Sequence, residues 1–159
     1  MVGNMKEVLK LKGRIEIVVR DRKGRIKKRF TIRNLITDVG LAQVAGLING
    51  VVTTPFKYIA IGTGTTSPTA GDTALEYEVA RALASTIERR TTNVTNDTAY
   101  LEYTFSSADG LSGTMDITES GVFDADTGGN MLCRQTFSAV SVNWDAGDQL
   151  TVKWSIVVS

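Results

Sequence analysis

The sequence predicts a mainly β protein: an antiparallel β-sandwich or a jelly-roll/barrel-like domain, with one short helix and an N-terminal basic β-hairpin arm. Short segments rich in β-branched and aromatic residues recur along the chain, and turns rich in glycine, aspartate and asparagine separate them. Only one segment, about 38–49, has the apolar spacing of a helix. The 159 residues fit a single domain that can bury a core without disulfides or metal.

The hairpin is expected near the N-terminus. Residues 8–20 alternate apolar and charged side chains, 21–24 form a turn that ends in glycine, and 25–32 return as the second strand. Seven basic side chains lie along the rims of this hairpin. They serve either as solvated edge charges that discourage sheet-to-sheet association or as docking residues for a partner. The basic side chains concerned are Arg20, Arg22, Lys23, Arg25, Lys27, Lys28 and Arg29.

The charge of the chain is divided unevenly. Residues 1–34 hold 12 of the 18 Lys and Arg residues but only 3 of the 17 acidic ones, whereas residues 35–159 carry a net charge of −8. Such asymmetry indicates that one part meets a charged partner. We therefore divide the chain into a basic arm, 1–33, and a β-rich body, 34–159, which we expect to fold without the arm.

The helix begins and ends with typical signals. Thr37 and Asp38 predict its N-cap, and the Asn49-Gly50 pair predicts its end. The spacing of four apolar residues predicts one buried face, made of Leu41, Val44, Leu47 and Ile48.

Further strands are expected at 56–61, 84–92, 99–106, 115–123, 131–137 and 149–158. The glycine-rich stretch 62–71 follows the first of these strands. It lacks the spacing of a dinucleotide-binding loop and the lysine of a phosphate-binding loop, so we interpret it as a tight loop. Whether this loop is an interface or an exposed tip stays open.

No set of residues predicts catalysis. The chain has no histidine, the commonest general base and metal ligand, and its single cysteine, Cys133, is expected to be buried and inert. Asp124, Asp126 and Asn130 resemble part of a calcium loop, but a hairpin turn explains them equally well. We expect no enzyme activity, no cofactor and no metal. We also expect no membrane segment, because no apolar run reaches about 20 residues, and no secretory signal.

Six stretches together resemble small virion proteins of tailed bacteriophages, and the resemblance covers about residues 34–156. The matching stretches are 34–37, 58–66, 72–76, 118–123, 131–137 and 146–152. The resemblance implies a non-enzymatic structural protein. Our leading interpretation is a capsid decoration (cement) protein that bridges and stabilises capsomers. The alternative is a tail or fibre component that mediates attachment.

These interpretations imply the major capsid protein or other virion proteins as partners, together with copies of the chain itself, a trimer being favoured. They imply a location in the virion, on the outer capsid surface or in the tail, after synthesis in the host cytoplasm. A nucleic-acid-binding β-barrel is the third interpretation. We expect it less, because Phe30 is the only aromatic residue of the hairpin that could stack on bases.

Overall fold

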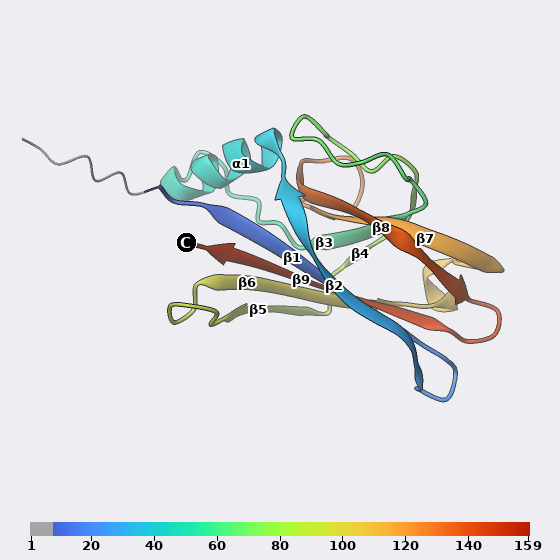
Figure 1. The fold of residues 1–159 in the computed structure, drawn as a ribbon. Coiled ribbons are helices and arrows are strands. Elements are labelled where there is room, and N and C mark those ends of the chain that lie inside the picture. The colour runs from blue at the N-terminus through green and yellow to red at the C-terminus, as the bar shows by residue number, and fades with distance from the viewer. Residues whose placement is uncertain (1–7) are drawn as a thin grey trace, which may run out of the picture.

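The computed structural model describes residues 8–159, which form nine β-strands, one α-helix and one short 3₁₀ helix (Figure 1). In chain order these elements are β1 (Leu11–Arg20), β2 (Ile26–Ile36), α1 (Asp38–Asn49), β3 (Tyr58–Gly62), β4 (Glu78–Leu83), β5 (Thr86–Arg90), β6 (Thr98–Phe105), η1 (Ser107–Asp109), β7 (Thr114–Phe123), β8 (Met131–Asn143) and β9 (Gln149–Val158).

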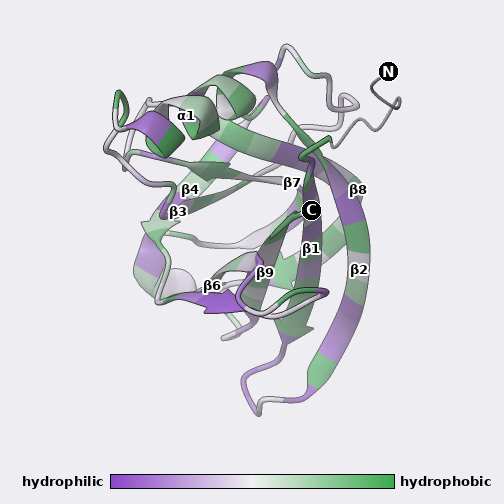
Figure 2. Ribbon diagram, turned by 90° about the vertical axis from the view of Figure 1, so that its left-hand side faces the viewer, coloured by the Kyte–Doolittle hydropathy of each residue, from purple (hydrophilic) through white to green (hydrophobic). Residues whose placement is uncertain are grey.

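All nine strands belong to one antiparallel sheet with the order β4-β3-β7-β8-β2-β1-β9-β6-β5. The sheet curls into a half-barrel, and α1 lies over one end of it (Figure 2). The edge strands β4 and β5 are joined by Ala84 and Ser85. The amide of Ala84 donates to Lys57 O, just before β3, and the amide of Ser85 donates to Glu102 O of β6, both at 2.9 Å. This two-residue connection is therefore hydrogen bonded to the chain at both ends of the sheet. The predicted mainly β, antiparallel and barrel-like fold is confirmed.

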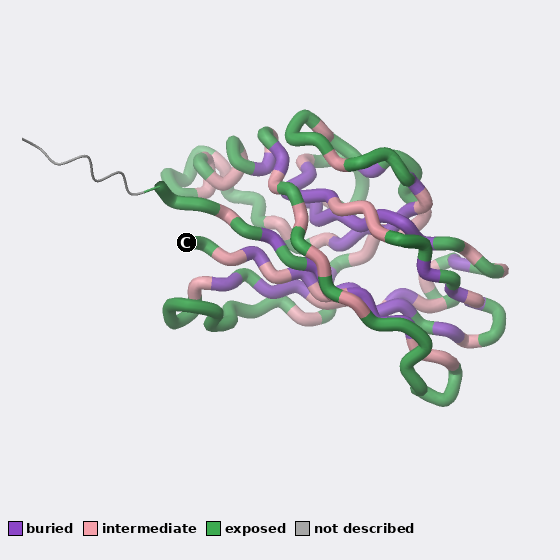
Figure 3. Tube along the Cα trace, viewed as in Figure 1, coloured by how far each residue is buried: buried purple, intermediate pink, exposed green. Residues whose placement is uncertain are grey.

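The predicted N-terminal hairpin is also confirmed, and it forms part of the sheet. β1 lies between β2 and β9 and pairs with β9 along its whole length, from Leu11 to Arg20. Ile15, Ile17 and Val19 point into the core and are at most 1% exposed. Only the end of the hairpin projects beyond the other strands, where the chain is exposed (Figure 3). Residues 1–7 of the predicted arm lie outside the described part of the chain.

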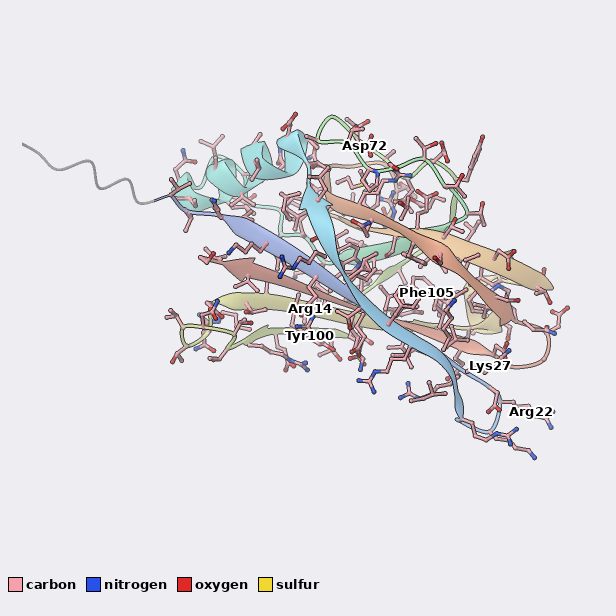
Figure 4. All side chains as sticks on the ribbon, in the orientation of Figure 1. Arg14, Arg22, Lys27, Asp72, Tyr100 and Phe105 are labelled. Atoms are coloured by element: carbon pink, nitrogen blue, oxygen red, sulfur yellow. The ribbon has the colours of Figure 1, made fainter. Side chains whose placement is uncertain are left out.

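The core fills the concave side of the sheet. On β9 the predicted alternation holds, because Leu150, Val152 and Trp154 are fully buried. Phe105 of β6 lies among them (Figure 4). The indole N–H of Trp154 donates to Ser120 Oγ at 3.2 Å, so this large core side chain also satisfies its polar atom.

The helix has the predicted ends but only part of the predicted buried face. Thr37 Oγ1 accepts the Gly40 amide at 2.9 Å, and Gly50 ends the helix with a φ of 79°. A Cβ on Gly40 would lie 2.5 Å from Leu132 O, so glycine allows the first turn to approach β8 closely. Of the predicted buried face, Val44 and Leu47 are half-buried, and Val44 packs against the core. Leu41 and Ile48 remain 48% and 73% exposed, so the prediction that these two are buried is wrong.

Candidate docking surface on the basic hairpin

The turn between β1 and β2 is fixed by Asp21. Its carboxylate accepts the amides of Lys23 and Arg25 at 2.9 and 3.0 Å and forms an ion pair with Arg25 Nε at 2.9 Å. Gly24 adopts a φ of 81°, which closes the turn. These bonds hold the pKa of Asp21 below its ordinary value, chiefly through the Arg25 amide. The end of the hairpin is therefore an ordered turn.

An ion pair near the turn ties the hairpin to the loop that precedes β9. Lys27 Nζ lies 2.6 Å from Asp148 Oδ2, and the Asp148 side chain is only 4% exposed. The same oxygen accepts the amide of Asn143 at 2.9 Å. Since Asp148 stands in the turn between β8 and β9, this pair holds the hairpin against that turn.

Two more of the predicted docking residues are engaged within the chain. Arg29 Nη2 lies 3.4 Å from Glu16 Oε2 across the β1–β2 ladder. Lys28 Nζ donates to Ala139 O at 3.3 Å and lies 5.9 Å from the centre of the Phe30 ring. Because Lys28 and Arg29 already have partners within the chain, they are less available to bind another protein.

The remaining three predicted residues have no ion pair or side-chain hydrogen bond with residues 8–159: Arg20, Arg22 and Lys23. Arg22 and Lys23 are exposed at the end of the projecting hairpin, where Figure 4 labels Arg22. Arg20 is half-buried at the last position of β1. We call these three residues the hairpin tip. Their role in docking stays a prediction.

A buried anchor that the sequence did not indicate lies beneath loop 62–71. Glu119 of β7 is fully buried, and its carboxylate accepts the amides of Gly64, Glu76 and Tyr77 at 2.7, 2.9 and 2.8 Å. Arg134 Nε of β8 lies 3.0 Å from Glu119 Oε1. One carboxylate therefore joins Gly64, near the start of the loop, to Glu76 and Tyr77, which lead into β4. Residues 63–71 form no helix or strand, as the prediction of a loop requires. A fully buried acid inside a strand gave no signal in the sequence.

Asp72 extends this anchor to the tip of the loop. Burial opposes its ionisation, but hydrogen bonds from Thr69 and Arg134 outweigh burial and hold the pKa of Asp72 below its ordinary value of 3.8. A lowered pKa means that the ionised carboxylate stabilises the fold. This stabilisation is complete above the ordinary pKa and is lost as the pH falls through the lowered value.

We expect the free energy of unfolding to decrease between about pH 5 and about pH 2. In the Asp72→Asn variant this decrease should be smaller, because the substituted residue no longer titrates. Urea unfolding at several pH values measures both curves. Identical pH dependence in the two proteins would contradict the role given to Asp72. Asp97, whose pKa is also lowered, chiefly by the Val94 amide, continues to titrate in the variant.

The other candidate residues do not come together as a site. Asp124 is occupied by Asn130, whose amide and side-chain nitrogens lie 2.7 and 2.9 Å from its carboxylate, and Asp126 is exposed. Burial raises the pKa of the Cys133 thiol well above its ordinary value. Within residues 8–159 no three acidic, cysteine or histidine side chains form a group that could hold a metal ion.

No helix in this range has the length and apolar character needed to cross a membrane.

Comparison with known proteins identifies the family. Residues 41–158 match the family model Gp80, described as podophage GP4 fiber I protein gp80. No curated protein matches the chain. The match begins within the helix and covers all strands from β3 onward, and the β1–β2 hairpin precedes it. The chain therefore belongs to this family of podophage fibre proteins and is a phage virion structural protein of the tail-fibre type.

Proposed function

We propose that the chain is a non-enzymatic tail or fibre component that attaches to an acidic surface of a neighbouring virion protein through its hairpin tip. The observation that carries this proposal is that Arg22 and Lys23 are exposed in the projecting turn, next to Arg20 at the end of β1, and that none of the three has a counter-charge in residues 8–159. Cations on a preorganised turn lose little conformational freedom on binding, and complementary charge sets orientation and association rate.

The rest of the structure supports a mechanical role for the hairpin. Asp21 fixes the turn and the Lys27–Asp148 pair fixes its base, so force on the tip passes directly into β1 and β9. The body of a second copy would be an acidic partner, since residues 35–159 carry a net charge of −8. Contact of one copy's tip with the next copy's body would close a ring, for which a trimer is the arrangement we favour.

Capsid decoration was our leading interpretation from the sequence. The family match favours the tail or fibre role, because the family is one of fibre proteins. A decoration protein would use the same tip to bridge capsomers on the outer capsid surface. The two roles differ in the place and number of copies in the particle.

Reversing the charge of the tip tests the proposal. In the triple variant Arg20→Glu, Arg22→Glu, Lys23→Glu, we expect incorporation into particles to decrease at least about tenfold, because attraction to an acidic partner becomes repulsion. Quantitative mass spectrometry of purified particles gives the number of copies relative to the major shell protein.

A second triple variant controls for charge alone. Lys10→Glu, Lys57→Glu, Arg89→Glu reverses three exposed charges that have no ion pair within residues 8–159 and lie away from the tip. We expect this variant to be incorporated at the normal level. Unchanged incorporation of the tip variant, or an equal loss in both, would overturn docking through the tip.

A further inference from the structure

Two arginines on the outer face of the sheet are placed directly opposite each other. Arg14 of β1 is the register partner of Arg33 of β2, and both side chains are exposed. Directly opposed residues of an antiparallel ladder lie on the same face, about 5 Å apart at their Cβ atoms, where like charges destabilise the sheet. Neither guanidinium has an ion pair or hydrogen bond with residues 8–159. The pair is a cost to stability that an external anion would offset.

Arg14 also stands between two hollows of this face. The first, of about 180 Å³, is polar and is lined by Arg14, Glu16, Arg90, Tyr100, Lys153 and Ser155. The second, of about 460 Å³, has Lys12, Arg14 and Arg33 among its lining residues. Figure 4 labels Arg14 and Tyr100, which both line the first hollow. An oxyanion at Arg14 would thus have room on either side and further cations within reach.

Carboxylates lie in the neighbouring row of the same face. The register aligns Glu16, Lys153 and Glu102 on β1, β9 and β6. Glu16 pairs with Lys153 at 3.2 Å, and Tyr100 donates to Glu102 at 2.5 Å. Each carboxylate keeps capacity to accept further hydrogen bonds. The face therefore offers cations to acidic groups and acceptors to hydroxyl groups, side by side.

We propose that this face binds an acidic glycan in which carboxylate or sulfate groups are separated by neutral sugars. The anionic groups lie at Arg14 and Arg33, where guanidinium groups bind oxyanions in bidentate fashion. The hydroxyl groups of the neutral sugars donate hydrogen bonds to the carboxylates of Glu16 and Glu102. Duplex DNA fits this pattern poorly, because one charge per about 1.7 Å would set phosphates against the carboxylates. The site is separate from the hairpin tip and does not depend on the proposed docking.

Binding to hyaluronan, in which carboxylates alternate with neutral sugars, tests the proposal by biolayer interferometry at physiological salt. We expect the double variant Arg14→Gln, Arg33→Gln to bind at least about tenfold more weakly than the natural chain, since two charge-assisted contacts are lost. It should unfold at the same or a higher temperature, because the repulsion between the arginines is removed.

The matched control is Arg20→Gln, Arg22→Gln, which removes the same charge from the same hairpin and should change binding less than about threefold. A duplex DNA and a neutral dextran serve as comparison ligands and should bind more weakly than hyaluronan. Equal losses in the two double variants, DNA binding as tight as that of the glycan, or no binding of hyaluronan by the natural chain would each overturn the proposal.

Discussion

Removal of residues 1–33 is expected to unfold the rest of the chain. β1 lies inside the sheet, hydrogen bonded to β2 and β9, and its loss would leave β9 with an open edge. Burial of Ile15, Ile17 and Val19 contributes about 5 to 9 kcal/mol at the usual value for such side chains. This is comparable to the whole stability of a typical domain, about 5–15 kcal/mol. The structure thus argues against our expectation that the body folds without the arm.

Circular dichroism and urea unfolding of the truncated chain measure this effect. The variant Arg22→Glu, Lys23→Glu of the full chain is the control, because both residues are exposed and lie in the turn between β1 and β2. We expect a cooperative transition in the control and none in the truncated chain. A truncated chain with the normal unfolding midpoint would show that residues 34–159 are an independent body.

The Glu119→Gln variant is expected to lose about 3–5 kcal/mol of unfolding free energy, the usual cost of breaking a buried ion pair. Arg134, 3% exposed, would lose its buried counter-charge and keep only Asp72. The new amide nitrogen would also face backbone N–H groups, because both carboxylate oxygens accept backbone amides. Urea unfolding of the full chain measures the loss.

Asp116→Asn is the matched control, since Asp116 is an exposed acid on the same strand. Its unfolding free energy should change by less than about 0.5 kcal/mol. In Glu119→Gln we also expect faster amide hydrogen exchange at Gly64 and Tyr77, because their acceptor oxygen is disturbed. Equal stability of the two variants would contradict the anchoring role of Glu119.

Local patterns predicted most of the strands. The alternation of Leu150, Val152, Trp154 and Ile156 indicated which side of β9 is buried, and all four are at most 4% exposed. The Thr37 and Gly50 signals gave the limits of α1. β4 was missed, because Glu78–Leu83 has few strong β-forming residues and contains a charged one, Arg81. Arg81 pairs with Glu78 at 2.7 Å, and the fold adds the carbonyls of Ala125 and Gly128 and the Phe123 ring, 3.6 Å from the guanidinium carbon.

The candidate site was predicted less completely, because its main contacts join distant parts of the chain. Nothing near Lys27 indicates that Asp148 will pair with it, and nothing near Glu119 indicates that its partners lie in loop 62–71 and on β8. The sequence analysis treated all seven basic rim residues alike. The fold separates those with partners in the chain from the hairpin tip. It also reveals Arg14 and Arg33, which become neighbours only through the strand register.

The position and number of copies of the chain in purified particles test its role as a tail or fibre component most directly. Electron cryomicroscopy locates the chain, and quantitative mass spectrometry counts it against the major shell protein. Our account predicts a small number of copies confined to the tail or its fibres. Copies spread over the shell in numbers similar to those of the shell protein would contradict it and restore capsid decoration.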